Sequence, residues 1–327
     1  MTNDPSSFTF TAGDADAGLR LDALLAQKID GWSRSRLQRL VENGDVLVNH
    51  KVAKPSYKLR AGDEVDVELS DEPAARFEPE NIPLKIVYED DFLAVINKPA
   101  GMVVHPGAGV HNGTLANALA YHFGIEAISI DASADEQSRI RDLKSKIGIV
   151  HRLDKDTSGL IVVAKDDETH EALSAQFSGR EVYKSYVALV HGSVAASTGR
   201  IERPIARDRW HRTKMTVAAD GRHALSKWKV RQRFEKFTLL DVEIMTGRTH
   251  QIRVHLASVN HPVVGDETYN EGRDNNIADI KIKQAVQRLG RFFLHAEKLS
   301  FVHPETGERL SFSSGLPDEL SQLLELL

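Results

Sequence analysis

A ten-residue stretch in the middle of the chain combines groups that could do chemistry with residues that favour a turn. It runs from His151 to Leu160, with the sequence HRLDKDTSGL, and leads into the apolar run 160–164. A polar turn before a buried strand is a common place for reactive groups, because the strand holds the turn in place. An ionised Asp154 could attack an electrophilic carbon there, provided that a cation keeps the carboxylate charged in a dry pocket.

Three other interpretations of this stretch compete with a nucleophile. Residues 154–159 imitate the start of an EF-hand calcium loop, but the twelfth position is Lys165, where calcium needs a carboxylate. Residues 156–159 also suit a structural turn, in which Asp and Ser cap backbone groups and the glycine takes a positive φ. Asp154 and Asp156 could instead be the carboxylate pair of a glycoside or nucleoside hydrolase. The stretch by itself does not decide between a turn and a catalytic carboxylate.

A second polar segment, residues 247–256, follows a predicted strand and opens a predicted helix. Its Arg253 is a candidate partner for a buried carboxylate, and the alternative is a surface arginine with its stem on apolar neighbours. His250 and His255 are five residues apart and not four, and no His-Glu-x-x-His motif is present, so we expect no metal site.

A third segment, residues 182–190, has the composition of a strand. Side chains alternate between the two faces of a strand, so Lys184 and Tyr186 share one face. A tyrosine in a strand is most often part of the core. A lysine and a tyrosine on one face would also suit a flat, anionic ligand such as a nucleotide.

The composition limits the class of protein. The 327 residues include 41% hydrophobic and 27% charged residues, which is ordinary for a globular protein. The absence of cysteine excludes disulfides and thiolate zinc sites and fits a reducing compartment. The start lacks a signal-like pattern, and the apolar runs are too short to cross a bilayer, so we expect a cytoplasmic protein without membrane contact.

The pattern of elements predicts an α+β protein with two domains. Residues 1–17 are a lead segment, and residues 18–70 form a small α/β module of two helices and a short sheet. Residues 71–84 are acidic and proline-rich, as in a linker. Residues 85–327 are predicted to be a larger domain on a mostly antiparallel mixed sheet, and the polar stretch 127–146 within it reads as a surface insertion.

Two groups of basic residues contrast with the net charge of −5. We expect the first, in the small module, to contact the phosphates of a nucleic acid, although a solvated helix face is the usual explanation of such a run. Its predicted RNA-binding members are Arg34, Arg36, Arg39, Lys51, Lys54 and Lys58. The second group suits either phosphate contact or a solvated loop, and consists of Arg200, Arg203, Arg207, Arg209, Arg212 and Lys214.

Together and in this order, the motifs resemble those of the RluA-type RNA pseudouridine synthases. The signature is 151–159, and supporting matches lie at 97–101, 104–106, 247–256 and 294–296. The small module resembles an S4 RNA-binding domain. The resemblance covers nearly the whole chain, and it implies an S4 domain followed by a pseudouridine synthase catalytic domain.

The resemblance also implies roles for individual residues. Asp154 would be the catalytic nucleophile, and Arg253 would pair with it. Tyr186 would stack on the target base, and it is a candidate for taking up a proton during catalysis. Arg152 would enter the RNA stack where the flipped uridine had been. Extruding a base costs a few kcal/mol and requires a filler and a stacking platform, which arginine and tyrosine can provide.

We also expect His151 and Lys184 to contact substrate. The implied partner is large-subunit ribosomal RNA, either free or within an assembling ribosomal particle, and no metal or small-molecule cofactor is expected for a redox-neutral isomerisation. The alternatives are a pseudouridine synthase acting on tRNA or on another rRNA site, and a non-catalytic RNA-binding factor in ribosome assembly.

Overall fold

The computed structural model describes residues 7–29, 32, 34–69, 76–107, 110–129, 143, 146–211 and 213–327, and of residues 7, 35, 36, 39, 43, 76 and 129 it describes the backbone alone. The chain divides into two compact units. The small unit comprises Met1–Glu78 with Ala127–Asp142, and the large unit comprises Pro79–Glu126 with Leu143–Leu327. The domain limits expected from the sequence, at residues 17, 70 and 84, stay predictions.

The small unit is built on a four-stranded antiparallel sheet with the strand order β1-β4-β2-β3. The strands are β1 (Ser7–Thr11), β2 (Val46–Val48), β3 (Lys51–Val52) and β4 (Glu64–Glu68). Two helices supply the apolar side chains that cover it, α1 (Leu21–Lys28) and α2 (Arg34–Asn43), after the short η1 (Asp14–Asp16). The sequence places Leu21, Leu24 and Leu25 at helical spacing, and Leu37 on the apolar side of the second helix; all four are completely buried, which confirms this pattern.

A buried carboxylate holds the two helices of the small unit together. Asp22 is fully buried and accepts hydrogen bonds from the guanidinium groups of Arg20 and Arg34 and from the amide of Gln38. The hydrogen bond from Arg20 is the main reason why the pKa of Asp22 lies well below its ordinary value. Arg34 therefore stabilises the fold, and its predicted contact with RNA stays a prediction.

Of the other predicted RNA-binding residues, the structure describes the side chains of the three lysines but not those of the two arginines. Lys51, Lys54 and Lys58 are exposed. Arg36 and Arg39 lie in α2, and their side chains are outside the described part of the chain.

In the predicted linker, Arg76–Phe77 form the short strand β5, which pairs with β8 (Ile128–Ser129). Most of the predicted insertion 127–146 is also outside the described residues.

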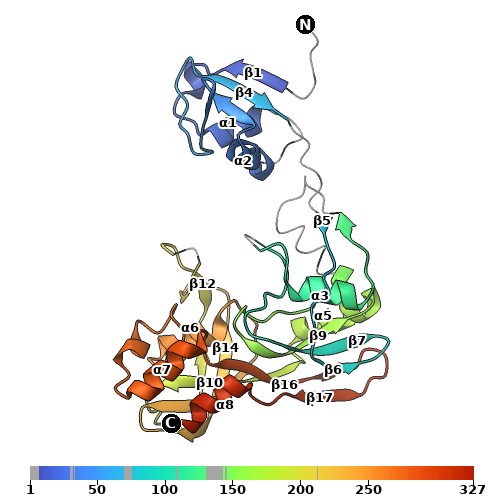
Figure 1. Cartoon of the computed structure of the whole chain (residues 1–327), viewed down its shortest axis with the longest axis vertical. Helices are drawn as coiled ribbons and strands as arrows, with labels where there is room; N and C mark the ends of the chain where they lie inside the picture. Colours follow the sequence, from blue (N-terminus) through green and yellow to red (C-terminus); the bar gives the residue numbers. More distant parts are fainter. Residues whose placement is uncertain are drawn as a thin grey trace. The chain divides into compact units, whose positions relative to one another are not determined.

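The large unit is built on a nine-stranded sheet with the order β11-β14-β15-β10-β16-β9-β7-β6, and β17 pairs with β16 (Figure 1). Only β9 and β16 pair in parallel; the other neighbours are antiparallel. The strands are β6 (Ile86–Glu89), β7 (Leu93–Lys98), β9 (Ser158–Ala164), β10 (Tyr183–His191), β11 (Thr198–Glu202), β14 (Leu225–Arg233), β15 (Phe237–Ile244), β16 (Leu294–Val302) and β17 (Arg309–Ser313). The predicted α+β class with a mostly antiparallel mixed sheet is confirmed.

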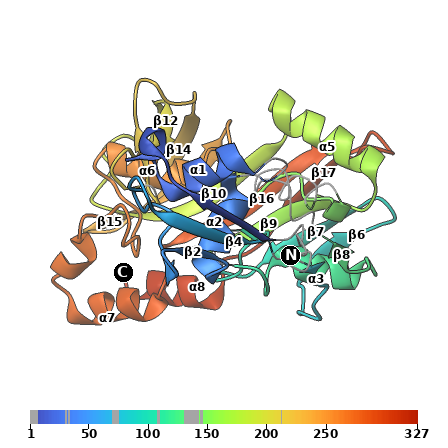
Figure 2. The same ribbon diagram turned by 90° about the horizontal axis from the view of Figure 1, so that it is seen from above.

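Helices and one hairpin complete the large unit. The hairpin consists of β12 (Ile205–Arg207) and β13 (Met215–Val217). The helices α7 and α8 contact each other, and they lie side by side in Figure 2. The helices are α3 (Leu115–His122), α5 (Asp167–Gly179), α6 (Gln251–Ser258), η2 (Arg273–Asn276), α7 (Ile280–Leu289) and α8 (Asp318–Glu325).

The strand that follows the central polar stretch is an inner strand of the sheet, between β16 and β7. All seven residues of β9 are buried, and α5 packs against it. Gly159 has φ +115°, and a Cβ there would lie 2.3 Å from the carbonyl oxygen of Ala296 in β16. Only glycine allows this close approach, which fixes the end of the polar stretch against β16. Among the described residues, no helix is long and apolar enough to cross a membrane.

Candidate active site

The segment 151–157 is held by contacts to its backbone. The amide of Thr157 donates to the carbonyl of Asp154 at 3.1 Å, which closes a turn. Arg291, which is nearly buried, donates from Nη1 to the carbonyl of Asp156 at 3.0 Å and to Ser158 Oγ at 3.2 Å. Thr157 and Ser158 are buried, so the structural role predicted for them agrees with their environment.

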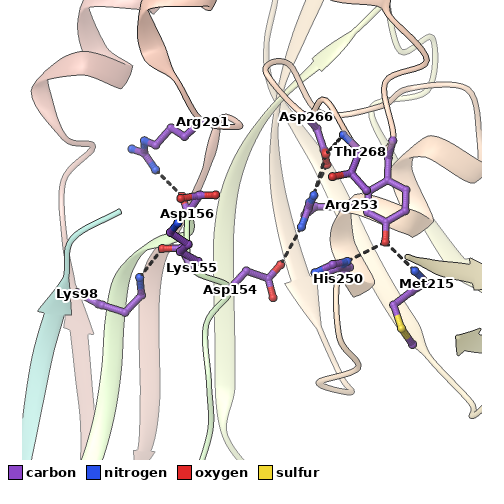
Figure 3. Close-up of polar contacts among 11 residues, drawn as sticks. Lys98, Asp154, Lys155, Asp156, Met215, His250, Arg253, Asp266, Thr268 and Arg291 are labelled. Atoms are coloured by element: carbon purple, nitrogen blue, oxygen red, sulfur yellow. Dashed lines mark hydrogen bonds and ion pairs between the residues drawn. The ribbon is translucent and has the colours of Figure 1, made fainter. Parts of the chain in front are cut away.

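A buried lysine holds the same segment from the other side. Lys98, at the end of β7, is completely buried, and its Nζ donates to the carbonyls of Pro99, Met102 and Lys155 at 2.8 to 2.9 Å. Figure 3 shows the bond to Lys155. Burial lowers the pKa of Lys98 to about 7. The sequence interpretation did not assign a site role to Lys98. The one indication of such a role in the sequence is that Lys98 lies within the family motif 97–101.

Asp154 meets a cation that is shared with a second carboxylate. Arg253, from α6, approaches Asp154 Oδ2 through Nη1 at 3.4 Å. Its Nε and Nη2 both bind Asp266, at 2.7 and 2.8 Å, in a bidentate pair (Figure 3). Bidentate pairs of this kind are the strong charge-assisted ones, so Asp266 fixes the plane of the guanidinium. The structure thus brings together the predicted Asp154 and Arg253, and adds Asp266.

Two aromatic rings enclose the guanidinium of Arg253. Its central carbon lies 4.2 Å from the ring centre of Phe292 and 5.0 Å from that of Tyr269. Burial lowers the pKa of Arg253, but hydrogen bonds from Arg253 to Asp266 and the nearby negative charges outweigh burial and raise it. Arg253 is therefore a permanent, nearly buried positive charge beside Asp154, which is 19% exposed.

The third predicted catalytic residue faces the same small pocket. Tyr186, in β10, is 7% exposed and lines a pocket of about 70 Å³ together with Asp154, Arg253 and Leu294. Burial, and then the negative charge of Asp154, raise the pKa of Tyr186 far above its ordinary value. Tyr186 is thus a neutral phenol at physiological pH, placed beside a carboxylate.

The residues predicted to bind substrate line a wider cleft of about 550 Å³ that also includes Tyr186. Arg152 is exposed. The Nζ of Lys184 lies 5.0 Å from the ring centre of Phe177, and burial lowers the pKa of this lysine. His151 stacks on Phe177 at 4.5 Å, its Nε2 accepts the amide hydrogen of Val162, and burial lowers its pKa to about 3. His151 is therefore neutral and part of the packing, and its contact with substrate stays a prediction.

Another cleft, of about 610 Å³, borders the other side of Asp154 and is lined by Arg253, Asp266 and Arg291 among others. The sequence interpretation did not assign site roles to Asp266, Tyr269 and Phe292. Asp266 and Tyr269 lie in a loop without periodicity, and the apolar pattern around Phe292 gives no sign of its contact with Arg253. Among the described residues, no cluster of three or more histidines and carboxylates could hold a metal ion. Asp154 therefore presents a partly exposed carboxylate next to the buried cation of Arg253.

Comparison with known proteins agrees with this geometry. A family model described as RNA pseudouridylate synthase matches residues 92–258, which span Asp154, Tyr186 and Arg253. The chain belongs to this family. A model of the S4 domain matches residues 19–65, in the small unit. The chain is thus an RNA pseudouridine synthase of the RluA type with an S4 domain, as the sequence motifs predict.

Relatives match this synthase over nearly its whole length. Ribosomal large subunit pseudouridine synthase D of Xanthomonas campestris is 40% identical over 96% of this chain and 90% of the relative. Uncharacterized RNA pseudouridine synthase YlyB of Bacillus subtilis is 39% identical over 97% of both. Among solved structures, the protein called Human RNA Pseudouridylate Synthase Domain Containing 1 matches with a TM-score of 0.54 and 24% sequence identity. The match covers 75% of this chain and 89% of the human chain, and at this identity it supports the fold alone.

Proposed function

We propose that this synthase converts uridine to pseudouridine at specific positions of large-subunit (23S) ribosomal RNA, with Asp154 as the nucleophile. The observation that carries the catalytic assignment is that Asp154 from the loop before β9, Tyr186 from β10 and Arg253 from α6 line one pocket. The choice of RNA is supported by full-length relatives called ribosomal large subunit pseudouridine synthase D. Relatives without a known target, such as that of Bacillus subtilis, make the RNA the part to be tested.

The reaction detaches uracil from the ribose and rejoins it through another atom. The bond from N1 to C1′ breaks, a bond from C5 to C1′ forms, the hydrogen on C5 leaves as a proton, and N1 gains a proton. Asp154 would start the reaction by attacking either C1′ of the ribose or C6 of the base. Both routes expel the C5 hydrogen, and neither changes the composition of the RNA.

The neighbours of Asp154 suit this reaction. Arg253 would offset the negative charge of the Asp154 carboxylate when the base excludes water from the pocket. Tyr186 would stack on the extruded uracil, and its neutral phenol would add no second negative charge beside Asp154. Exposed Arg152, on the border of the pocket and of the wider cleft, would fill the gap left in the RNA stack. Lys184 would contact the phosphates near the target.

Release of tritium from RNA labelled at C5 of uridine tests the proposal. We would compare 23S rRNA, 16S rRNA and tRNA transcripts, using the wild type, Asp154→Asn and Asp156→Asn. Asp156→Asn is a matched control, because Arg291 binds the Asp156 backbone carbonyl and not its carboxylate. We expect release from 23S rRNA by the wild type and Asp156→Asn, and none by Asp154→Asn, which should still bind the RNA.

The other outcomes separate the alternatives. Release from tRNA or 16S rRNA alone would assign a different substrate. Tight binding of rRNA without release from any transcript would favour an assembly factor or a substrate that exists only in a particle. Appearance of free uracil would indicate a hydrolase, and loss of activity in both variants would implicate the carboxylate pair.

A further inference from the structure

A tryptophan lies exposed in the loop of the β12–β13 hairpin. Trp210 is 89% exposed, more than any other large apolar side chain among the described residues. The hairpin extends from the body of the large unit (Figure 1). Tryptophan is the largest apolar side chain, and single-stranded nucleic acid uses exposed aromatic rings as stacking platforms.

Hydrogen bonds hold the described residues on either side of Trp210 in a turn. The carboxylate of Asp208 accepts the amide hydrogens of Trp210 and His211, at 2.8 and 2.7 Å. The amide of Asp208 donates to the carbonyl of Lys214 at 2.9 Å, and the amide of Lys214 donates to the carbonyl of His211 at 2.8 Å. The amide of Trp210 itself is thus held by the side chain of Asp208, in a turn stabilised by these bonds.

The base of the hairpin is attached to the residues that hold Arg253. The amide of Met215 donates to the hydroxyl of Tyr269 at 2.8 Å, and Lys214 Nζ donates to the carbonyl of Thr268 at 3.0 Å. Tyr269 is one of the two rings that enclose Arg253. A group bound at Trp210 would thus be held in a fixed relation to the pocket of Asp154, within the same compact unit.

The charge around Trp210 suits an anionic partner. Arg207, Arg209 and Lys214 flank it in the sequence, in a chain with a net charge of −5. Arg209 pairs with Asp220, but the two side chains are 80% and 63% exposed, so the pair adds little stability. A phosphate could therefore compete for Arg209 at little cost.

We propose that the β12–β13 hairpin is a contact arm for the substrate RNA, in which Trp210 stacks on an unpaired base. This inference rests on the RNA-modifying activity of the enzyme and does not depend on which RNA is its target. The base belongs to the same RNA as the target uridine, and Arg209 contacts its backbone. Stacking on an indole tolerates any base, so Trp210 contributes affinity and position, whereas the pocket of Asp154 selects the uridine.

Steady-state kinetics of tritium release test the arm in the full-length enzyme. Trp210→Ala should lower kcat/KM about 5- to 100-fold, mostly through KM, because stacking contributes about that factor per base. Trp210→Phe keeps a ring and should recover most of the activity. Tyr121→Ala, in α3, removes an aromatic ring that is 52% exposed and serves as the matched control, with no change expected. An unchanged kcat/KM in Trp210→Ala, or an equal loss in Trp210→Phe, would overturn the proposal.

Fluorescence gives a readout that does not depend on which RNA is modified. A single-stranded RNA of about twenty nucleotides should quench the wild type more than Trp210→Phe, and the duplex of the same sequence should not. Equal quenching of both proteins would exclude stacking on Trp210, even if rRNA proves not to be the substrate.

Sedimentation of the wild type and Trp210→Ala tests whether Trp210 contacts a second copy of the chain. A dimer that is present in the wild type and lost in Trp210→Ala would also overturn the proposal.

Discussion

Arg253 is bound by both carboxylate oxygens of Asp266, whereas it reaches Asp154 only through its third nitrogen. The contacts to Asp266 are 2.7 and 2.8 Å long, and the contact to Asp154 is 3.4 Å. Asp266 itself is 1% exposed and accepts the backbone amide hydrogen of Thr268. The orientation of the cation beside the proposed nucleophile is therefore set by Asp266.

Replacing Asp266 should impair catalysis more than binding. In Asp266→Asn, Arg253 keeps its charge but loses the bidentate contact, so its position relative to Asp154 becomes less defined. A displacement of about 1 Å can cost about 100-fold in rate, and we expect kcat to fall by about that factor with KM for the RNA nearly unchanged. Single-turnover tritium release and filter binding separate the two effects.

A matched variant shows whether the effect is specific. Glu267 is the exposed neighbour of Asp266, and Glu267→Gln makes the same change of charge. It should leave kcat within about twofold. Breaking a buried ion pair also costs about 3 kcal/mol of stability, so unfolding in urea must be measured alongside. A parallel loss of folded protein and activity would contradict a positioning role for Asp266.

The protonation state of Tyr186 leads to a prediction about pH. Its pKa is raised above the ordinary value, so the phenol should stay protonated from about pH 7 to about pH 10. The ratio of kcat/KM between the wild type and Tyr186→Phe should therefore be constant over that range. If a phenolate with an ordinary pKa were the base that removes a proton, the ratio would rise about tenfold per pH unit towards pH 10.

The sequence predicts the elements that have a local pattern. The sequence predicts a helix at residues 115–122, and the structure has α3 there; Thr114 caps its first turn by accepting from the amide of Asn117. Leu21 and Leu25 likewise lie in the buried face of α1. Their signals depend on neighbours within one turn, which the sequence contains.

The elements that escaped prediction depend on partners distant in the chain. The sequence predicts a short strand at residues 292–294; this prediction is wrong in its limits, because β16 runs from Leu294 to Val302. His295 interrupts its apolar pattern, yet it is fully buried, because Ser158 and the carbonyl of Ser314 bind its ring. In the active site, Asp266 lies in a loop without periodicity, so nothing local indicates that it binds Arg253.

The exposed lysines of the small unit should contribute to RNA binding through charge alone. In the triple variant Lys51→Gln, Lys54→Gln, Lys58→Gln, the slope of log K against log salt should decrease in magnitude by about 2 if each lysine contacts a phosphate. Affinity for rRNA should fall most at low salt, and kcat at saturating RNA should not change. Filter binding at several salt concentrations measures the slope.

A charge-matched triple variant in the large unit provides the comparison. Lys229, Lys236 and Lys298 are exposed there, and their replacement by glutamine removes the same total charge. If both triple variants lower the slope equally, the effect is one of net charge, and the small unit does not hold a specific RNA contact. If only the first does, the exposed lysines of the S4 domain lie on the RNA.

Asp90 should make the stability of the large unit depend on acid pH. It accepts hydrogen bonds from the hydroxyl of Tyr88, from the amides of Phe92 and Leu93, and from His303. Burial would raise the pKa of Asp90, but these bonds outweigh it and lower the pKa to about 2. Since the pKa is lower in the folded state, the stabilisation is complete above the unfolded value of about 3.9 and is lost as the pH falls towards 2.

The difference between these two pKa values corresponds to about 2 to 3 kcal/mol. Asp90→Asn should therefore lower the free energy of unfolding by about 2 kcal/mol at neutral pH, and this deficit should shrink as the pH falls from about 4 to about 2. Asp91→Asn changes the exposed neighbouring carboxylate and should show no such trend. Urea unfolding followed by circular dichroism measures both variants. A deficit for Asp90→Asn that is the same at every pH would show that its side chain stabilises the fold by shape and not by charge.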